Sequence, residues 1–264
     1  MHDLHIAFLQ CDLRWSDRDA NLAHINTFLE QVQPGTDLVL LPETFTTAFP
    51  ADPCRYSEKT DGATLQWMRQ QAQRLDAVVC GTLLLETEGS YRNSLVWMCP
   101  DGSFELYHKR HPFSIGGENL LIKKGETPLI VEWKGWRIKP MVCYDIRFPV
   151  WARNRYHDGQ YDYDFAFYLA NFPDSRMVVW NTLLVARAIE NQAYIAGINR
   201  VGDDPNGLLH YCGSSQAVNA HGEVLAHLDP YAEGLVHCTL DYEALQRFRT
   251  KFPLGPDWDR FTVE

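Results

Sequence analysis

The fold expected for this chain is decided by one stretch of sequence, Ile138-Lys139-Pro140-Met141-Val142-Cys143-Tyr144-Asp145-Ile146-Arg147-Phe148-Pro149. Its apolar β-like first half ends at Cys143, and a polar turn then leads into a predicted helix. In open α/β sheets, sites collect where strands end. Backbone N–H groups of such a turn can favour a thiolate and stabilise a developing oxyanion. The alternative is that Cys143 is one of the inert buried cysteines common in proteins, so its surroundings must decide.

Composition limits the classes of protein to which the chain can belong. The 264 residues carry a net charge of −10, without a Lys/Arg run, which argues against nucleic acid as a partner. We expect no membrane partner, because the longest apolar stretches fall short of the roughly 18 residues that a spanning helix needs. Residues 1–5 lack the basic start and apolar region of a signal peptide. We therefore expect a cytoplasmic protein.

The cysteine pattern excludes a disulfide framework. There are seven cysteines, an odd number, scattered along the chain without a CxxC pair. His108 and His111 form an HxxH pattern, but no cluster of further ligands accompanies it. We expect neither a metal site nor a cofactor.

Hydrophobic periodicity predicts alternating strands and helices in two halves of similar plan. Strands are expected over 4–13, 37–41, 77–85, 91–98, 104–108, 129–133, 136–142, 165–170, 193–198, 214–219, 223–228 and 235–240. Helices are expected from Ser16 to about 33, over 60–75 and 148–156, from Asp174 or Ser175 to about 191, and after Asp241. No linker divides the halves, so residues 1–264 form one predicted α/β domain, with a tail from about 252 that leaves the core.

Three side chains of complementary chemistry each directly follow a predicted strand. They are Glu43, Lys109 and Cys143, which could supply a base, a cation for an oxyanion and a nucleophile. Glu and Lys alone are most often solvated at the ends of loops. Their joint placement with a cysteine at one sheet edge favours catalysis.

The same residues carry a resemblance to a known family. The segments Leu40-Leu41-Pro42-Glu43-Thr44-Phe45, Tyr107-His108-Lys109-Arg110-His111-Pro112-Phe113 and 142–149 resemble, in order and spacing, the three signature blocks of the nitrilase superfamily of carbon–nitrogen hydrolases. The resemblance extends to 187–192, which is similar to the family's long-helix motif, and reaches 222–225. It therefore covers nearly the whole chain.

The resemblance implies a four-layer αββα sandwich with mixed sheets, which forms a homodimer through its helical layer. It implies that Glu43 is the general base, that Lys109 and the N–H of Tyr144 stabilise the oxyanion, and that Cys143 forms a thioester. Glu118 resembles the second glutamate of the family, beside the lysine. The alternative for Glu118 is an ordinary loop carboxylate.

Within the superfamily, Cys143–Pro149 and 170–173 look most like the omega-amidase branch. Such enzymes release ammonia from α-ketoglutaramate and α-ketosuccinamate, the keto products of glutamine and asparagine transamination. Phe172 stands where that branch commonly has tryptophan, which leaves the substrate's shape open. Other superfamily hydrolases, such as an aliphatic amidase, an N-carbamoyl amino acid hydrolase or a nitrilase, are alternatives. The non-enzymatic alternative is a thiol sensor or a binding protein with the same fold.

A half-amide substrate needs a cation for its free carboxylate. Arg147, four residues after Cys143, is one candidate and Arg110 another, and a salt bridge within the turn is the alternative role for both. The substrate is expected to be a small-molecule amide. Its pocket is expected to be lined by Phe113, Tyr144, Asn171 and Phe172, although aromatic residues at such positions are more often core.

Overall fold

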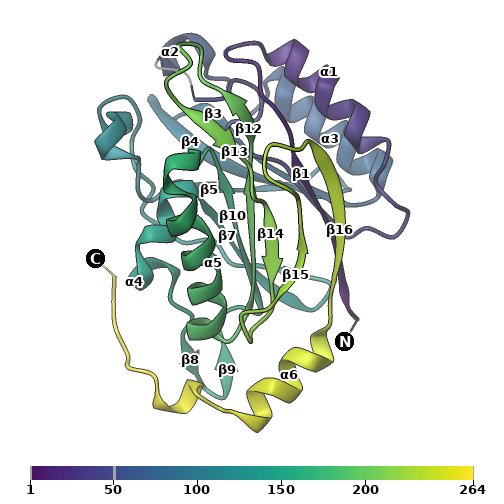
Figure 1. The fold of residues 1–264 in the computed structure, drawn as a ribbon, viewed down its shortest axis with the longest axis vertical. Coiled ribbons are helices and arrows are strands. Elements are labelled where there is room, and N and C mark those ends of the chain that lie inside the picture. The colour runs from purple at the N-terminus through teal and green to yellow at the C-terminus, as the bar shows by residue number, and fades with distance from the viewer. Residues whose placement is uncertain (1, 50–51, 264) are drawn as a thin grey trace.

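Two six-stranded mixed sheets form the centre of the molecule in this computed structural model, which describes residues 2–49 and 52–263 (Figure 1). The first sheet has the order β16 (Gly234–Leu240), β1 (Leu4–Gln10), β2 (Leu38–Leu40), β3 (Val78–Thr87), β4 (Ser90–Met98) and β5 (Phe104–His108). The second has the order β15 (Val224–His227), β14 (Gln216–Val218), β11 (Tyr194–Asn199), β10 (Phe165–Ala170), β7 (Trp136–Val142) and β6 (Val131–Trp133). The two halves of the chain thus build sheets of similar plan.

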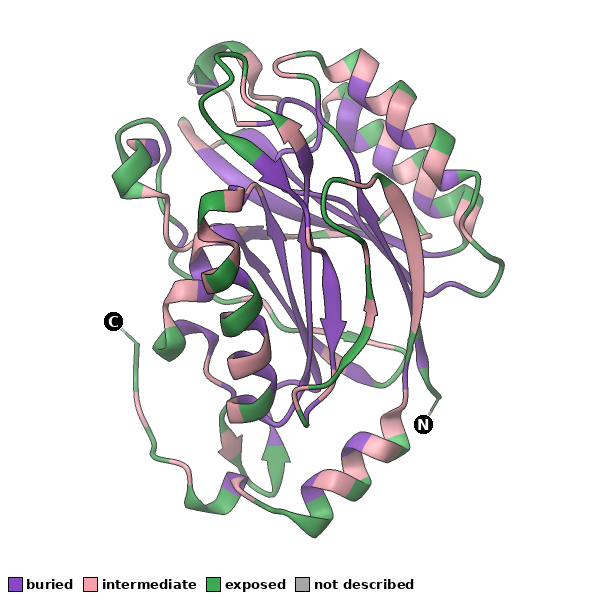
Figure 2. Ribbon diagram, viewed as in Figure 1, coloured by how far each residue is buried: buried purple, intermediate pink, exposed green. Residues whose placement is uncertain are grey.

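Helices cover the outer face of each sheet. α1 (Arg18–Leu29) and α3 (Ala63–Leu75) lie on the first sheet, and α5 (Met177–Asn191) lies on the second (Figure 1). The short α2 (Pro53–Tyr56) and α4 (Pro149–Ala152) lie in connections, and α6 (Tyr242–Lys251) follows β16. Both sheets are buried throughout their centres, whereas the helices expose their outer faces (Figure 2). The predicted αββα layering is confirmed.

Alternation along β2 shows why the sheets are buried on both faces. Leu38 and Leu40 pack between the two sheets, whereas Val39 packs against the helices. A strand covered on both sides therefore appears in the sequence as a continuous apolar run. Between the sheets, Trp97 of β4 stacks on Phe167 of β10 with ring centroids 6.5 Å apart.

Parallel pairing brings the ends of the functional strands to one edge. β1, β2 and β3 are mutually parallel, as are β7, β10 and β11. β5 runs in the same direction as β3, because each is antiparallel to β4. Glu43, Lys109, Cys143 and Asn171 therefore all follow strands at the same edge of the two-sheet core.

Two predicted helices differ from the structure. The helix predicted to begin at Ser16 begins at Arg18, with the Asp17 carboxylate accepting a hydrogen bond from the N–H of Ala20 at 3.1 Å, and it ends at Leu29 rather than near 33. The helix predicted over 148–156 contains only Pro149–Ala152. The Asn154 side chain instead donates to the Tyr163 carbonyl at 2.9 Å, which anchors the hairpin of β8 (Tyr156–His157) and β9 (Gln160–Tyr161).

The start of α5 also differs from expectation. Residues Asp174–Arg176 form a 3-10 turn, closed by the N–H of Arg176 donating to the Pro173 carbonyl, so α5 begins only at Met177. The tail after α6 leaves the helix but still packs on the surface, where Trp258 lies edge-on to Tyr161 at 5.3 Å. The hairpin of β12 (Val201–Asp203) and β13 (His210–Cys212) was not predicted.

Across residues 2–49 and 52–263, the helices are all too short or too polar to cross a bilayer.

Candidate active site

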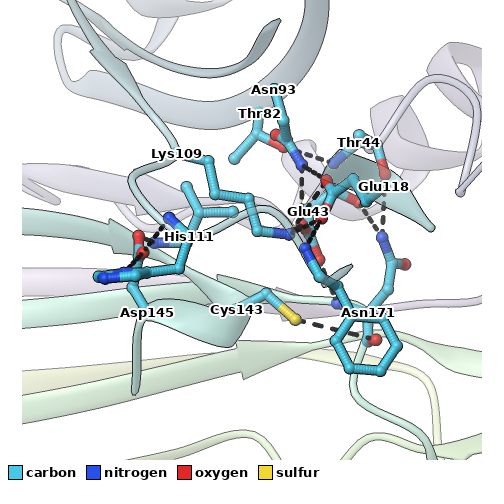
Figure 3. Close-up of polar contacts among 12 residues, drawn as sticks. Glu43, Thr44, Thr82, Asn93, Lys109, His111, Glu118, Cys143, Asp145 and Asn171 are labelled. Carbon is cyan, nitrogen blue, oxygen red and sulfur yellow. Dashed lines mark hydrogen bonds and ion pairs between the residues drawn. The ribbon is translucent and has the colours of Figure 1, made fainter. Parts of the chain in front are cut away.

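Cys143 lies directly after β7, as the first residue of a 3-10 turn over Cys143–Arg147. Its φ of +43° lies in the left-handed region, which a non-glycine residue adopts only where the surroundings hold it. The thiol lies 3.9 Å from the carbonyl oxygen of Asn171, at the end of the neighbouring strand β10. In Figure 3 its sulfur points to the side on which Glu43, Lys109 and Asn171 gather.

Glu43 follows β2 and is completely buried. Its Oε1 accepts hydrogen bonds from Nζ of Lys109 and from Nδ2 of Asn93, both at 2.8 Å. Its Oε2 accepts one from the backbone N–H of Asn171 at 2.8 Å. Buried carboxylates require such partners, and these bonds hold both oxygens beside the thiol.

Lys109 follows β5 and is also fully buried, between two carboxylates (Figure 3). Its Nζ lies 2.8 Å from Oε1 of Glu43 and 2.8 Å from Oε2 of Glu118. Burial lowers the pKa of Lys109, but the charges of Glu118 and Glu43 outweigh it and hold the pKa well above its ordinary value. The lysine is therefore a permanent cation. Of its three N–H donors, one remains beyond those that face the two carboxylates.

Glu118 lies on a 3-10 turn, Glu118–Leu120, and completes the cluster. Its Oε2 accepts a further hydrogen bond from the backbone N–H of Phe113, and its Oε1 lies 3.3 Å from Nδ2 of Asn93. Asn93, in the middle of β4, thus donates hydrogen bonds to both carboxylates.

The environment of Cys143 favours the protonated thiol. Burial raises its pKa, and the charge of Glu43 raises it further, whereas Lys109 acts in the opposite direction and only in part offsets them. The pKa of the Cys143 thiol is therefore held well above its ordinary value. Any preference for the thiolate that the N–H groups of the turn provide is outweighed, because desolvation dominates the pKa of Cys143.

A third buried carboxylate, Asp145, holds the turn that begins at Cys143. Its oxygens accept hydrogen bonds from the N–H of Val142 at 3.1 Å, from the hydroxyl of Tyr107 at 2.7 Å, and from both the N–H (3.0 Å) and Nδ1 (2.8 Å) of His111. The Nε1–H of Trp151 also donates to Tyr107, at 2.9 Å. Asp145 therefore ties the cysteine turn to the segment that carries Lys109.

A cavity of about 180 Å³ opens over this cluster. Cys143, Glu43 and Lys109 contribute to its lining. Its walls are mostly aromatic, and they include Phe49, Phe113, Tyr144, Phe172 and Tyr211. Two guanidinium groups, those of Arg147 and Arg176, also line it. The arrangement places a thiol, a carboxylate and a fixed ammonium group at one wall of a small pocket with positive charge, and these groups could act as nucleophile, base and oxyanion donor.

The sequence model of the family described as carbon-nitrogen hydrolase matches residues 5–250. This chain belongs to the carbon-nitrogen hydrolase family. It is accordingly an enzyme that hydrolyses carbon–nitrogen bonds.

Individual relatives agree with this membership. The chain is 44% identical over 263 residues to "Omega-amidase YafV" of Escherichia coli strain K12, with all of both chains covered. It is 28% identical over 255 residues to "2-oxoglutaramate amidase" of Bacillus subtilis, with 96% of each covered. The crystal structure of XC1258 from Xanthomonas campestris, a CN-hydrolase superfamily protein with an arsenic adduct in its active site, superposes with a TM-score of 0.97 at 43% identity over all of both chains.

The predicted site residues of this carbon-nitrogen hydrolase fall into two groups. Glu43, Lys109, Glu118 and Cys143 form the polar cluster, and the cavity is lined by Phe113, Tyr144, Arg147, Asn171 and Phe172. The side-chain amide of Asn171 donates to the carbonyl of Glu43 (3.1 Å) and to the hydroxyl of Thr44 (2.9 Å), so it supports Glu43 as well as the wall.

Arg110, the second candidate for a carboxylate ligand, is not part of the cavity lining. Its Nη1 donates to the Gly125 carbonyl at 3.3 Å, and its guanidinium lies 5.0 Å from the ring of Trp151. Sequence reasoning missed Asn93, Asp145 and Arg176. A polar Asn93 in an otherwise apolar strand was the available signal for the first; for the other two, only the fold shows their roles.

Proposed function

We propose that this enzyme is a cysteine-dependent omega-amidase, which hydrolyses the terminal amide of a small 2-oxo carboxylate such as α-ketoglutaramate or α-ketosuccinamate. The observation that carries the proposal is the cavity itself, where Cys143 and the Glu43–Lys109–Glu118 cluster face two guanidinium groups. The names of the relatives, an omega-amidase and a 2-oxoglutaramate amidase, support the same substrate class.

In the first step the sulfur of Cys143 attacks the amide carbon while Glu43 takes the thiol proton. Because the pKa of the thiol is raised, proton removal accompanies the attack rather than preceding it. The oxyanion that develops on the amide oxygen accepts hydrogen bonds from the remaining N–H of Lys109 and the backbone N–H of Tyr144. One such donor is typically worth ~3 kcal/mol of barrier.

In the second step the carbon–nitrogen bond breaks. Glu43 returns its proton to the leaving nitrogen, ammonia departs, and a thioester remains on Cys143. Glu43 then takes a proton from water, whose oxygen attacks the thioester carbon. The thiolate leaves, regains the proton from Glu43, and the free acid is released.

Glu118 acts as a positioning residue in this scheme. Its carboxylate accepts hydrogen bonds from Nζ of Lys109 and from the backbone N–H of Phe113. It holds Nζ of Lys109 in place and supplies a second negative charge beside the ammonium group, in addition to that of Glu43. Arg147 binds the free carboxylate of the substrate, since its guanidinium lines the cavity four residues after the nucleophile.

The proposal extends to the assembly and setting of the chain. Residues 1–264 act as one domain, because a single core cluster joins strands of both sheets. The chain forms a homodimer through α5 and β15, which expose Val178, Ile189, Val224 and Leu225. The cytoplasm is the proposed location, since the seven cysteines are free thiols, as is usual in a reducing compartment.

Ammonia release from a panel of amides tests the proposal. The panel contains α-ketoglutaramate, succinamate, glutamine, an uncharged aliphatic amide and an aliphatic nitrile, with Cys143→Ala as the blank. We expect fast release from α-ketoglutaramate and succinamate and little from glutamine or the nitrile. Faster release from the uncharged amide than from either carboxylate would contradict the proposal and identify an aliphatic amidase.

A further inference from the structure

Two arginines of the cavity come from separate elements and lie on separate aromatic walls. Arg147 lies on the nucleophile turn, with its guanidinium carbon 5.5 Å from the ring centre of Phe172. Arg176 ends the 3-10 turn before α5, with its guanidinium carbon 4.9 Å from the ring centre of Phe113. Stacking on a ring holds a guanidinium plane while leaving its N–H edge available for hydrogen bonds.

Among the residues that the structure describes, no acidic side chain neutralises either guanidinium. Within residues 2–49 and 52–263, no carboxylate oxygen lies within 4.0 Å of a nitrogen of Arg147 or Arg176. Arg147 and Arg176 are half-buried, whereas two buried arginines do have such partners: Arg200 pairs with Asp12 at 2.7 Å and Arg187 with Glu190 at 2.8 Å. The two cavity arginines therefore present charge that a ligand can neutralise.

The charges of the site specify the ligand's charge. Glu43 and Glu118 contribute two negative charges, and Lys109, Arg147 and Arg176 contribute three positive ones, so with a neutral thiol the site carries a net charge of +1. A substrate with one carboxylate makes the occupied site neutral. A dicarboxylate would leave it with an excess negative charge.

We propose that Arg176 is a specificity-determining residue that, together with Arg147, recognises the 2-oxo group of the substrate. This inference rests on the proposed function and deepens it. A carboxylate without a neighbouring keto group accepts two parallel hydrogen bonds from a single guanidinium. A 2-oxo carboxylate presents a third oxygen in nearly the same plane, and a second guanidinium can bind that keto oxygen together with one carboxylate oxygen. Two arginines therefore favour 2-oxo half-amides over half-amides without the keto group.

The wall that carries Arg176 is connected to the catalytic cluster. The backbone N–H of Phe113, whose ring lies under Arg176, donates to Glu118, and Glu118 in turn contacts Lys109. The Phe113 ring is also edge-on to Tyr144, next to the nucleophile, at 5.0 Å. Arg176 is thus held in a fixed relation to the reacting atoms.

Steady-state kinetics of Arg176→Gln with three amides tests the inference. The substrates are α-ketoglutaramate, glutaramate, which lacks only the keto group, and uncharged butyramide. We expect kcat/KM for α-ketoglutaramate to fall at least tenfold, mainly through KM, while glutaramate loses less than threefold and butyramide is unchanged. Arg147→Gln is expected to lower kcat/KM for both carboxylate substrates. Arg247→Gln, on the exposed face of α6, is the control variant and is expected to leave kcat/KM for all three amides unchanged.

Equal losses for α-ketoglutaramate and glutaramate, or no loss for either, would overturn the assignment of Arg176. Arg176→Lys keeps the charge but not the fork, and we expect an intermediate KM for α-ketoglutaramate. If Arg176→Gln fails to fold, Arg176→Lys is judged by the same selectivity between the two carboxylates. Failure of the proposed function would appear separately, as wild-type enzyme inactive on all three amides.

Discussion

At Cys143, two opposing influences act on one proton. Burial and the Glu43 carboxylate stabilise the thiol, and the Lys109 ammonium stabilises the thiolate only in part. A thiolate formed before substrate arrives would place a third negative charge beside Glu43 and Glu118. In the proposed mechanism the resting enzyme therefore keeps the proton on sulfur, and Glu43, which is buried and held by three donors, takes it only as the new bond forms.

Alkylation of Cys143 by iodoacetamide is expected to be slow at pH 7 and to rise with pH. A raised pKa means that the thiolate is scarce below that pKa and increases about tenfold per pH unit toward it. Glu43→Gln removes one cause of the raised pKa, so its profile should move to lower pH. Peptide mass spectrometry measures Cys143, with exposed Cys54 as the internal control. A profile that already reaches its plateau at pH 7 in the wild type would contradict this account.

Glu118→Gln tests the positioning role of the second glutamate. The amide is nearly the same size but cannot balance the charge of Lys109, so Nζ loses one of its two fixed carboxylates. We expect kcat to fall about 100-fold, equivalent to roughly 2.7 kcal/mol of barrier, with little change in KM. Glu126→Gln, in the loop that follows, is the control. Wild-type kcat in Glu118→Gln would show that this carboxylate is an ordinary loop residue.

At the scale of elements, the active site depends on how Asp145 joins two connections. The turn after β7 and the segment after β5 both donate to its buried carboxylate. Removing a buried, fully hydrogen-bonded charge leaves several donors unpaired. The positions of both connections are then no longer fixed relative to each other.

Asp145→Asn is expected to lower the free energy of unfolding by about 2–4 kcal/mol and to reduce kcat. The amide nitrogen cannot accept, so at least one of the donors Val142, Tyr107 and His111 loses its partner. Urea denaturation gives the stability and ammonia release the activity. Tyr107→Phe is the comparison variant: it keeps the charge of Asp145 but removes one of its donors, together with the hydroxyl that accepts from Nε1–H of Trp151 and from the N–H of Arg110, and should cost about 1–2 kcal/mol. Equal stability of Asp145→Asn and wild type would refute the role of the network.

Elements set by local pattern were predicted well, and those set by tertiary contacts were not. β5, β7 and β10 have the expected bounds: β10 is a continuous apolar run, β5 and β7 contain apolar and polar residues in near alternation, and polar residues or turns bound all three. The helix over 148–156 was wrong because Asn154 bonds a carbonyl nine residues later, which no local propensity reveals. The position of Arg176 in the cavity depends on how α5 is docked, so its sequence neighbours carried no signal. Asp145 lay within the quoted block, but its partners other than Val142 are distant in sequence: Tyr107 is 38 residues away and His111 is 34 residues away.

At the scale of the whole molecule, apolar surface on the α5 side of the second sheet is the basis for the proposed homodimer. Sedimentation equilibrium should give a mass of about twice the 30.4 kDa chain. Ile189→Glu together with Val178→Glu places two charges on this face and is expected to yield monomers. Ile115→Glu, at an exposed position in the 3-10 turn Ser114–Gly116 and outside α5 and β15, is the control that should stay dimeric. A monomeric wild type at micromolar concentration would contradict the proposal.

The central claim, that Cys143 carries the acyl group of a 2-oxo half-amide, is tested most directly by intact-mass spectrometry. The enzyme is mixed with α-ketoglutaramate, quenched with acid within milliseconds and digested to locate the modified peptide. We predict a mass gain equal to the substrate minus ammonia, on Cys143, which appears before steady-state turnover and is absent from Cys143→Ala. Rapid ammonia release without any acyl group on Cys143, or with the same release from Cys143→Ala, would contradict the account.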